Sequence, residues 1–237
     1  MRVSLLVLLW TALAAGCGGE GEGTVTVTAY GESFIEEGIP TSAVDDGWAI
    51  DFSRFQVGLR DVKVAGADIA VPASVELTKP SSGKGHSLGT AQVPEGDHSD
   101  AGFTIARVEV NGTATKGTVT KTFAWVFEQP TVYSRCETTT KVTADGSATF
   151  QITVHADHLF YDSMAAAEPK LLFQAVADAD ADSDGEVTQA ELTAQGIGAY
   201  DPGSEGGIDD LWSWLTAQTR TLGHVDGEGH CHTDSSS

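Results

Sequence analysis

Residues 48–64 read WAIDFSRFQVGLRDVKV, a run in which apolar and polar side chains alternate. Such alternation is typical of a β-strand that has one buried face and one exposed face. The pattern slips near Arg54, because Phe55 follows Phe52 by three positions instead of two. The two faces carry Ala49, Asp51 and Ser53 on one side and Ile50, Phe52 and Phe55 on the other. We therefore predict a strand with a bulge or bend near Arg54.

Shorter runs of the same kind lie on either side of this strand, separated by Gly, Asp and Pro turns. They cover residues 24–30, 69–77, 103–110, 119–127, 131–142 and 148–155. This spacing predicts an antiparallel β-sandwich or open barrel over residues 24–158. The stretch from Lys79 to Ala101 is rich in turn residues and is predicted to be a long loop. In one interpretation of the chain, as an adhesion or surface-assembly module, this loop carries the ligand contacts.

The periodicity changes at Asp162. Pro169 favours the start of a helix, and the apolar residues after it recur at helical spacing. A second set of apolar residues at helical spacing follows Asp-Pro-Gly at residues 201–203, a sequence that interrupts a helix. The two faces consist of Leu171, Leu172, Ala175 and Val176, and of Ile208, Leu211, Trp212, Leu215 and Leu222. The sequence thus predicts an α+β fold with a helical subdomain over residues 159–223 and a His- and Gly-rich tail over residues 224–237.

Acidic residues outnumber basic ones across the 237-residue chain, with 34 Asp and Glu, 13 Lys and Arg, and a formal net charge of −21. Nucleic-acid binders neutralise phosphates with clustered Lys and Arg, so we predict no nucleic-acid partner. A content of 41% hydrophobic and 20% charged residues indicates a globular chain and not a disordered acidic segment.

The N-terminus has the features of an export signal. Arg2 precedes an apolar run from Val3 to Ala15, which is too short to span a bilayer as a helix. The run leads into Ala14-Ala15-Gly16-Cys17 and resembles the lipobox of bacterial lipoproteins, with Ala14 where that family more often has Leu.

The lipobox resemblance implies that residues 1–16 are removed as a signal peptide. Cys17 then carries a lipid that anchors the protein to a membrane of the cell envelope. Residues 17–23 are rich in Gly and form a flexible tether. An exported chain can form disulfides, so we predict that the remaining pair, Cys136 and Cys231, is bonded; the alternative is two free thiols.

Residues 180–191 read DADSDGEVTQAE. This stretch resembles the twelve-residue calcium loop of the EF-hand family, with Gly185 at the sharp turn. The resemblance implies that calcium is bound by side chains of Asp180, Asp182, Asp184, Thr188 and Glu191 and by the backbone carbonyl of Glu186. The physical chemistry agrees, because clustered carboxylates repel one another without a cation and all-oxygen ligands suit calcium better than zinc or copper.

The surroundings of this loop differ from those of a paired EF-hand. Gly196 and Gly198 limit the outgoing helix, and no second loop has the ligand spacing. With 2 Met in the chain, a calmodulin-like sensor with a Met-rich groove is not predicted. We expect this loop to hold calcium continuously outside the cell and to stabilise the helical subdomain. The chain as a whole is then predicted to be a binding or structural module, and we assign no catalytic residue.

Histidines gather in two short segments. Residues 154–158 read VHADH, and residues 223–232 read GHVDGEGHCH. A hairpin turn at residues 145–146 places Cys136 opposite His155, and the predicted disulfide then brings the second segment to the first. Imidazoles and carboxylates gathered in this way favour zinc or copper(II). The ligands predicted for this second metal site are His155, Asp157, His158, His224, His230 and His232.

Other interpretations of the histidines stay open. In one, His155 and His158 cap a strand and a helix and the tail is disordered. In another, residues 153–158 partly resemble the metallo-β-lactamase motif H-x-H-x-D-H, with Thr153 in place of its first His. The main prediction is thus a calcium-binding envelope lipoprotein, and the alternative is a zinc- or copper-handling protein or metallohydrolase. The sequence identifies no protein or carbohydrate partner.

Overall fold

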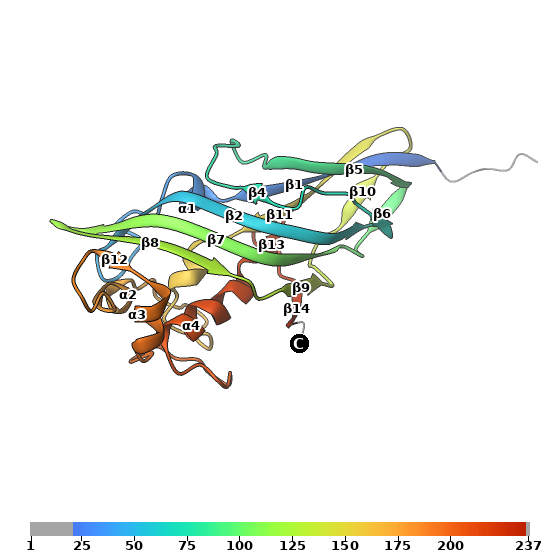
Figure 1. Ribbon diagram of the computed structural model, residues 1–237. Coiled ribbons are helices and arrows are strands. Elements are labelled where there is room, and N and C mark those ends of the chain that lie inside the picture. The colour runs from blue at the N-terminus through green and yellow to red at the C-terminus, as the bar shows by residue number, and fades with distance from the viewer. Residues whose placement is uncertain (1–20, 236–237) are drawn as a thin grey trace, which may run out of the picture.

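The computed structural model describes residues 21–235, which form two main β-sheets and several short helices (Figure 1). The predicted signal peptide and Cys17 lie outside the described residues. Strands make up 45% of the structure and helices 14%, so the fold is α+β and sandwich-like, as the sequence predicts. Among residues 21–235, no helix has the length and apolar character needed to cross a membrane.

The first sheet has four strands in the order β13-β11-β1-β5. Their bounds are Glu22–Gly31 for β1, His86–Pro94 for β5, Ser147–Val154 for β11 and Gly223–Val225 for β13. β1 and β11 run parallel, up to the pair Gly31 and Val154, whereas the other pairs are antiparallel. The parallel pair departs from the predicted antiparallel sandwich. Because β1 and β11 run in the same direction, both strands end at the same edge of the sheet. Glu32, which follows β1, therefore lies beside His155, which follows β11.

The second sheet is larger and has the order β12-β8-β7-β2-β3, with β4 and β9 attached to β2 and β7, and β14 paired with β9. The bounds are Ala49–Val64 for β2, Ala67–Asp68 for β3, Val75–Glu76 for β4, Gly102–Lys116 for β7, Val119–Phe127 for β8, Thr131–Ser134 for β9, Glu186–Val187 for β12 and His232–Ser235 for β14. The register of β2 against β7 shifts between Phe52 and Arg54, which confirms the predicted bulge.

Two local predictions about the β region are wrong. The expected loop from Lys79 to Ala101 contains β5 and also β6 (Gly96–His98), which pairs with β10 (Thr140–Val142). β5 buries few side chains, chiefly Leu88 and Val93, so the stretch lacks clear apolar alternation. The expected hairpin ladder is also absent among the described residues, because the strands around the 145–146 turn pair elsewhere, β10 with β6 and β11 with β1 and β13.

The helices are short. Their bounds are Ser33–Glu36 for α1, Gln174–Asp178 for α2, Gln189–Ala194 for α3 and Leu211–Gln218 for α4, with 3-10 turns at Asp157–Phe160 and Thr219–Thr221. α2 begins later than Pro169 suggests, because Leu171 forms a bridge with Tyr161. The carboxylate of Asp46 accepts hydrogen bonds from the backbone N–H groups of Phe173 and Gln174, at 2.8 and 2.7 Å, and so fixes the start of α2.

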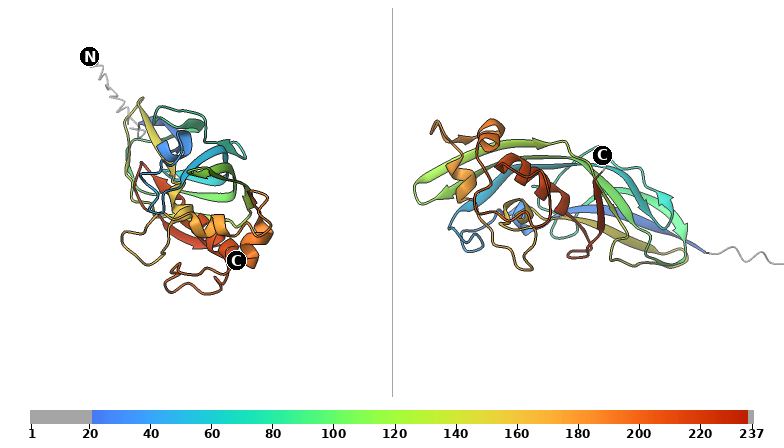
Figure 2. Two further views of the ribbon diagram at one scale, coloured as in Figure 1. Left: turned by 90° about the vertical axis from the view of Figure 1, so that its left-hand side faces the viewer. Right: turned by 90° about the horizontal axis from the view of Figure 1, so that it is seen from below.

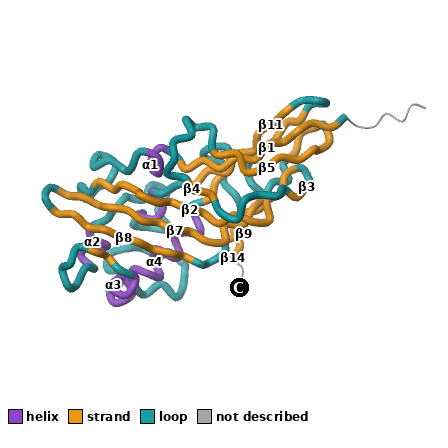
Figure 3. Tube along the Cα trace, turned by 45° about the horizontal axis from the view of Figure 1, so that its top comes forward, coloured by secondary structure: helices purple, strands orange, loops and turns teal. Residues whose placement is uncertain are grey.

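The C-terminal helices pack on the buried face of the large sheet, behind it in Figure 3. Trp48 meets Phe173 at 5.3 Å between ring centroids, and Phe127 stacks on Trp212 at 4.6 Å. The molecule is elongated, with the start of β1 toward one end and α2, α3 and β12 toward the other (Figures 1 and 2). The 180–191 loop is therefore far from the point where the predicted tether joins the fold.

Candidate metal centre

Two links hold the histidine segments together at the end of the first sheet. β13 pairs with β11 so that His224 lies opposite Thr153. The predicted disulfide between Cys136 and Cys231 is formed and joins positions 95 residues apart. Next to it, the backbone N–H of Glu137 donates to the carbonyl of His230 at 2.7 Å. The disulfide thus brings residues 223–232 close to residues 154–158, as expected, although the predicted hairpin does not form between the described strands.

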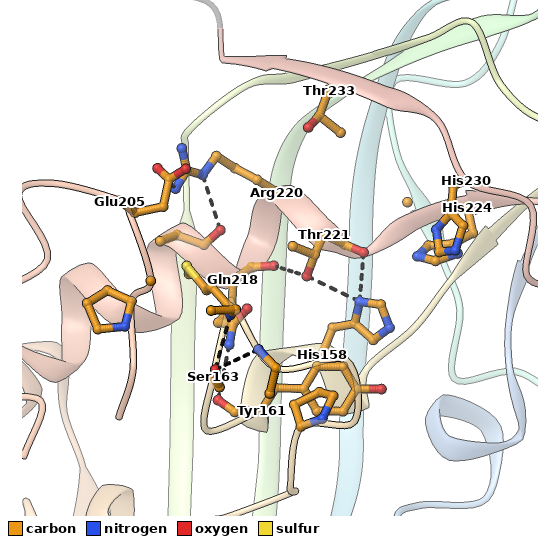
Figure 4. A pocket seen from close by; sticks show the side chains of 18 of the residues that line it. His158, Tyr161, Ser163, Glu205, Gln218, Arg220, Thr221, His224, His230 and Thr233 are labelled. Carbon is orange, nitrogen blue, oxygen red and sulfur yellow. Dashed lines mark hydrogen bonds and ion pairs between the residues drawn. The ribbon is translucent and has the colours of Figure 1, made fainter. Parts of the chain in front are cut away.

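Four imidazole rings meet as a result. The ring centroid of His224 lies 4.3 Å from that of His155, 5.1 Å from that of His158 and 5.0 Å from that of His230. His155 and His158 are 5.1 Å apart. Figure 4 shows His224 and His230 together, with His158 turned toward them from the other side of the pocket. We call these four residues the histidine centre.

Hydrogen bonds orient two of the rings. His158 Nδ1 lies 2.8 Å from the carbonyl oxygen of Thr221, so this nitrogen carries the proton and Nε2 is left as a metal ligand. His155 Nδ1 lies 3.1 Å from Oε2 of Glu32, and its Nε2 lies 3.2 Å from the carbonyl oxygen of Gly227. Both nitrogens of His155 can donate to these oxygens only in the imidazolium form.

Carboxylates complete two overlapping groups around His155. Ligand atoms of His155, His224 and Glu228 all lie within 4.8 Å of one another, and so do those of His155, Asp157 and His158. Tyr161 donates its hydroxyl hydrogen to Oδ2 of Asp157 at 2.8 Å. These donors, imidazole nitrogen and carboxylate oxygen, suit zinc or copper(II).

Buried atoms without partners provide a test of whether a metal fits. Nδ1 of His224 and Oδ1 of Asp157 are both inaccessible to solvent and have no hydrogen-bond partner. A buried polar atom left unpaired costs about 1 to 3 kcal/mol of stability. A metal ion bound to His155 and His224, or to His155 and Asp157, would satisfy one of these atoms, so the residues present fit a metal centre.

The pKa values of the histidines follow from burial and neighbours. Burial, followed by repulsion from His155, His158 and His230, lowers the pKa of His224 to about 4. Burial also lowers the pKa of His158. Burial opposes the charge on His155, but the Glu32 carboxylate and the Gly227 carbonyl outweigh it and raise its pKa. At neutral pH, His224 and His158 are therefore uncharged and ready to bind a metal ion.

The low pKa of His224 predicts a loss of stability in acid. An unfolded histidine binds a proton near pH 6.5, whereas folded His224 resists protonation down to a pKa of about 4. Because the unfolded state then holds more protons, the free energy of unfolding of the metal-free protein should fall as the pH drops through this window. Urea unfolding at about pH 7 and pH 5 measures the fall, which should be smaller for His224→Asn; an equal fall in both proteins would contradict the assignment.

The histidine centre opens into a pocket of about 1100 Å³. His158, His224, His230 and Glu228 line one part of it, and Arg220 and Glu205, which form an ion pair at 3.1 Å, line another (Figure 4). A metal ion at this centre would be reached from solvent through the pocket, as at sites that keep a position for an exchangeable ligand.

The structure brings five of the six predicted ligands together: His155, Asp157, His158, His224 and His230. It does not bring His232 to them, because β14 pairs His232 with Ser134 and its Nδ1 faces Asp234 at 3.5 Å. Thr153, in the place of the metallo-β-lactamase histidine, accepts a hydrogen bond from the Gly227 N–H at 2.9 Å. Glu32, Glu228 and Tyr161 were not foreseen; Glu228 lies in the quoted histidine segment, but the contacts of Glu32 depend on the unexpected parallel pairing.

The predicted calcium loop forms a turn against the edge of the large sheet. Gly185 has a φ of +92°, a conformation that glycine adopts without strain. β12 pairs in parallel with β8, and the Thr122 N–H donates to the Gly185 carbonyl at 2.8 Å. Trp125 Nε1 donates to the Val187 carbonyl at 2.9 Å. β8 therefore gives this single loop the strand partner that the sequence did not reveal.

Part of the expected ligand set converges within the loop. Oxygen atoms of Asp180, Asp182 and Glu191 lie within 4.8 Å of one another. The other predicted side chains bond within the loop: Asp184 accepts from the Glu186 N–H at 2.7 Å, and the Thr188 hydroxyl donates to Glu191 at 2.8 Å. Thr188 and Glu191 also form the capping box of α3, and the hydrogen bonds from Thr188 lower the pKa of Glu191.

Comparison with protein-family models, curated proteins and solved structures gives no significant match to this chain.

Proposed function

We propose that this protein binds one zinc or copper(II) ion at the histidine centre and handles that ion outside the cytoplasm. The observation that carries the proposal is the meeting of four imidazole rings, 4.3 to 5.1 Å apart, from segments far apart in the chain. The buried and unpartnered Nδ1 of His224 supports it, because a metal ion would satisfy this atom.

The proposed ligands are His155, His224 and Glu228, whose ligand atoms lie within 4.8 Å of one another, with His158 or His230 as a fourth. A metal ion would supply Lewis acidity or redox chemistry at the wall of the pocket. Glu32 orients His155 by accepting the hydrogen bond from its Nδ1. A metal ion would bind Nε2 in place of the proton that faces the Gly227 carbonyl.

Titration calorimetry tests the proposal directly. Zinc and copper(II) are added separately to the metal-free chain, purified without a His tag. One ion should bind per chain, with a dissociation constant that does not change in the double variant His86→Ala, His98→Ala, because these histidines bond to the Lys79 and Pro94 carbonyls outside the centre. Absence of stoichiometric binding of either ion would contradict the proposal.

Glu32 provides a sharper test of the geometry. Residues that orient a metal-binding histidine through its second nitrogen typically contribute about 10- to 100-fold to metal affinity. We expect Glu32→Gln to weaken zinc binding within that range, whereas Glu36→Gln, a matched change in α1 next to Glu32, should have little effect. Competition with a zinc-binding dye measures both affinities, and equal affinities for the two variants would rule out the orienting role.

We also propose that residues 180–191 bind calcium, as a second site with a structural role. The convergence of Asp180, Asp182 and Glu191 and the buried, unpartnered Oδ1 of Asp180 support this site. Bound calcium would join α2, α3 and β12 to the edge of β8 and so fasten the helical region to the large sheet. A second metal of different chemistry is expected here, because all the ligands are oxygen atoms.

Export with a lipid anchor on Cys17 is proposed as the setting for both sites. The disulfide between Cys136 and Cys231 supports an oxidising compartment. Fractionation of cells tests the anchor: the protein should sediment with membranes, and recovery in the cytosol would contradict the proposal.

A further inference from the structure

The calcium loop already holds a positive charge that comes from the neighbouring strand. Lys121, on β8, forms an ion pair between its Nζ and Oδ2 of Asp180, the first position of the loop. The side chain of Asp180 has no exposed surface, and that of Lys121 is 16% exposed. The other carboxylate oxygen of Asp180, Oδ1, is buried and has no partner. Asp180 thus already binds one positive charge through Oδ2, and its Oδ1 has no partner and can accept a second cation.

We propose that Lys121 is a resident counter-ion that competes with calcium for Asp180 and thereby sets the affinity of the loop. This inference rests on the proposed calcium site. When calcium is absent, the ammonium group offsets the repulsion among Asp180, Asp182 and Glu191 and keeps the loop folded on β8. When calcium binds, it takes over Asp180, and Lys121 must move to solvent or share the carboxylate.

The pairing of β8 with β12 holds the backbone of Lys121 next to the calcium loop, so that only its side chain can move. The next residue, Thr122, pairs with Glu186 and donates its N–H to the Gly185 carbonyl, so the backbone around Lys121 is fastened to the loop. Gly185 also donates its N–H to Oδ2 of Asp180 at 3.0 Å, the oxygen that Lys121 contacts. Without the ammonium group, Oδ2 of Asp180 still accepts the hydrogen bond from Gly185, but no positive side chain competes with calcium for it.

Substitution of Lys121 by Met tests this competition, because Met keeps the length of the side chain without its charge. We expect Lys121→Met to tighten calcium binding by about tenfold, because calcium then no longer competes with the ammonium group for Asp180. In the presence of a chelator, the same variant should melt at a lower temperature than the wild type, because its acidic side chains repel one another.

Two further variants separate this effect from others. Lys116→Met removes the same charge nearby, but Lys116 bonds to the amide oxygen of Gln174 at 2.8 Å and not to the loop, so its calcium affinity should stay within twofold of the wild type. Lys121→Arg keeps the charge and should also stay near the wild-type affinity. Calorimetric titration of the full mature chain with calcium measures all four proteins.

The outcomes distinguish the inference from the calcium site itself. If the wild type binds calcium and Lys121→Met binds it equally or more weakly, Lys121 does not compete and the inference is wrong, although the site stands. If no protein in the set binds calcium, the site itself fails. If Lys121→Met is unfolded in chelator, refolding on addition of calcium supports the inference, and failure to refold in excess calcium overturns it.

Discussion

His224→Ala is expected to abolish stoichiometric binding of zinc or copper(II). His224 is the ring nearest to the others, with its centroid 4.3 to 5.1 Å from those of His155, His158 and His230. Loss of a direct ligand should weaken binding by more than about 100-fold, because residues that merely orient a ligand already contribute about 10- to 100-fold. Competition with a chelator of known affinity measures the change.

The fold should survive this substitution. Nδ1 of His224 has no hydrogen-bond partner, so removal of the ring breaks no hydrogen bond of that atom and leaves chiefly a small cavity. A circular dichroism spectrum like that of the wild type, together with unchanged calcium affinity, establishes that the variant is folded. His232→Ala is the matched control, because His232 lies in the same segment but outside the centre. Equal loss of metal binding in both variants would place the ion elsewhere.

Glu191→Gln is expected to weaken calcium binding by more than about 100-fold. The Glu191 carboxylate is the proposed last ligand of the loop, and replacing it removes a negative charge and one of two equivalent oxygens. Calcium at about 100 times its dissociation constant should stabilise the wild-type protein by about 2.7 kcal/mol. This calcium-dependent rise in melting temperature should be lost in the variant at the same calcium concentration.

Glu191 also caps α3, so the variant is expected to be less stable than the wild type even without calcium. The informative quantity is therefore the difference in melting temperature with calcium and with chelator, measured for each protein. Glu186→Gln is the control, since Glu186 is predicted to contribute only its backbone carbonyl to the ion. If Glu186→Gln and Glu191→Gln lose calcium stabilisation to the same extent, the assignment of ligands is wrong.

The sequence predicted those parts of the fold that depend on local patterns. Alternation in residues 48–64 identified β2, and the three-residue spacing between Phe52 and Phe55 located its bulge. The pairing of Cys136 with Cys231 followed from counting cysteines in a chain that we predicted to be exported. The histidine segments were recognised by composition, and the disulfide supplied a reason for them to meet.

Other features depend on contacts between distant segments, which a single sequence does not encode in its periodicity. The parallel pairing of β1 with β11 places Glu32 beside His155, and no local pattern in residues 22–31 predicts that partner. The N–H groups at the start of α2 bond to Asp46, more than 120 residues earlier, so the helix begins after the position that Pro169 suggests. The ion pair of Lys121 with Asp180 likewise depends on docking of β12 along β8.

Diffraction from crystals of the metal-loaded protein, collected at the zinc or copper absorption edge, tests the central claim most directly. We predict a single strong anomalous peak within about 2.0 to 2.2 Å of nitrogen atoms of His155 and His224 and of a carboxylate oxygen of Glu228, which are the usual lengths of bonds from zinc to these ligands. A peak only at surface histidines such as His86 or His98, or no peak near the histidine centre in protein that binds the ion in solution, would contradict the account.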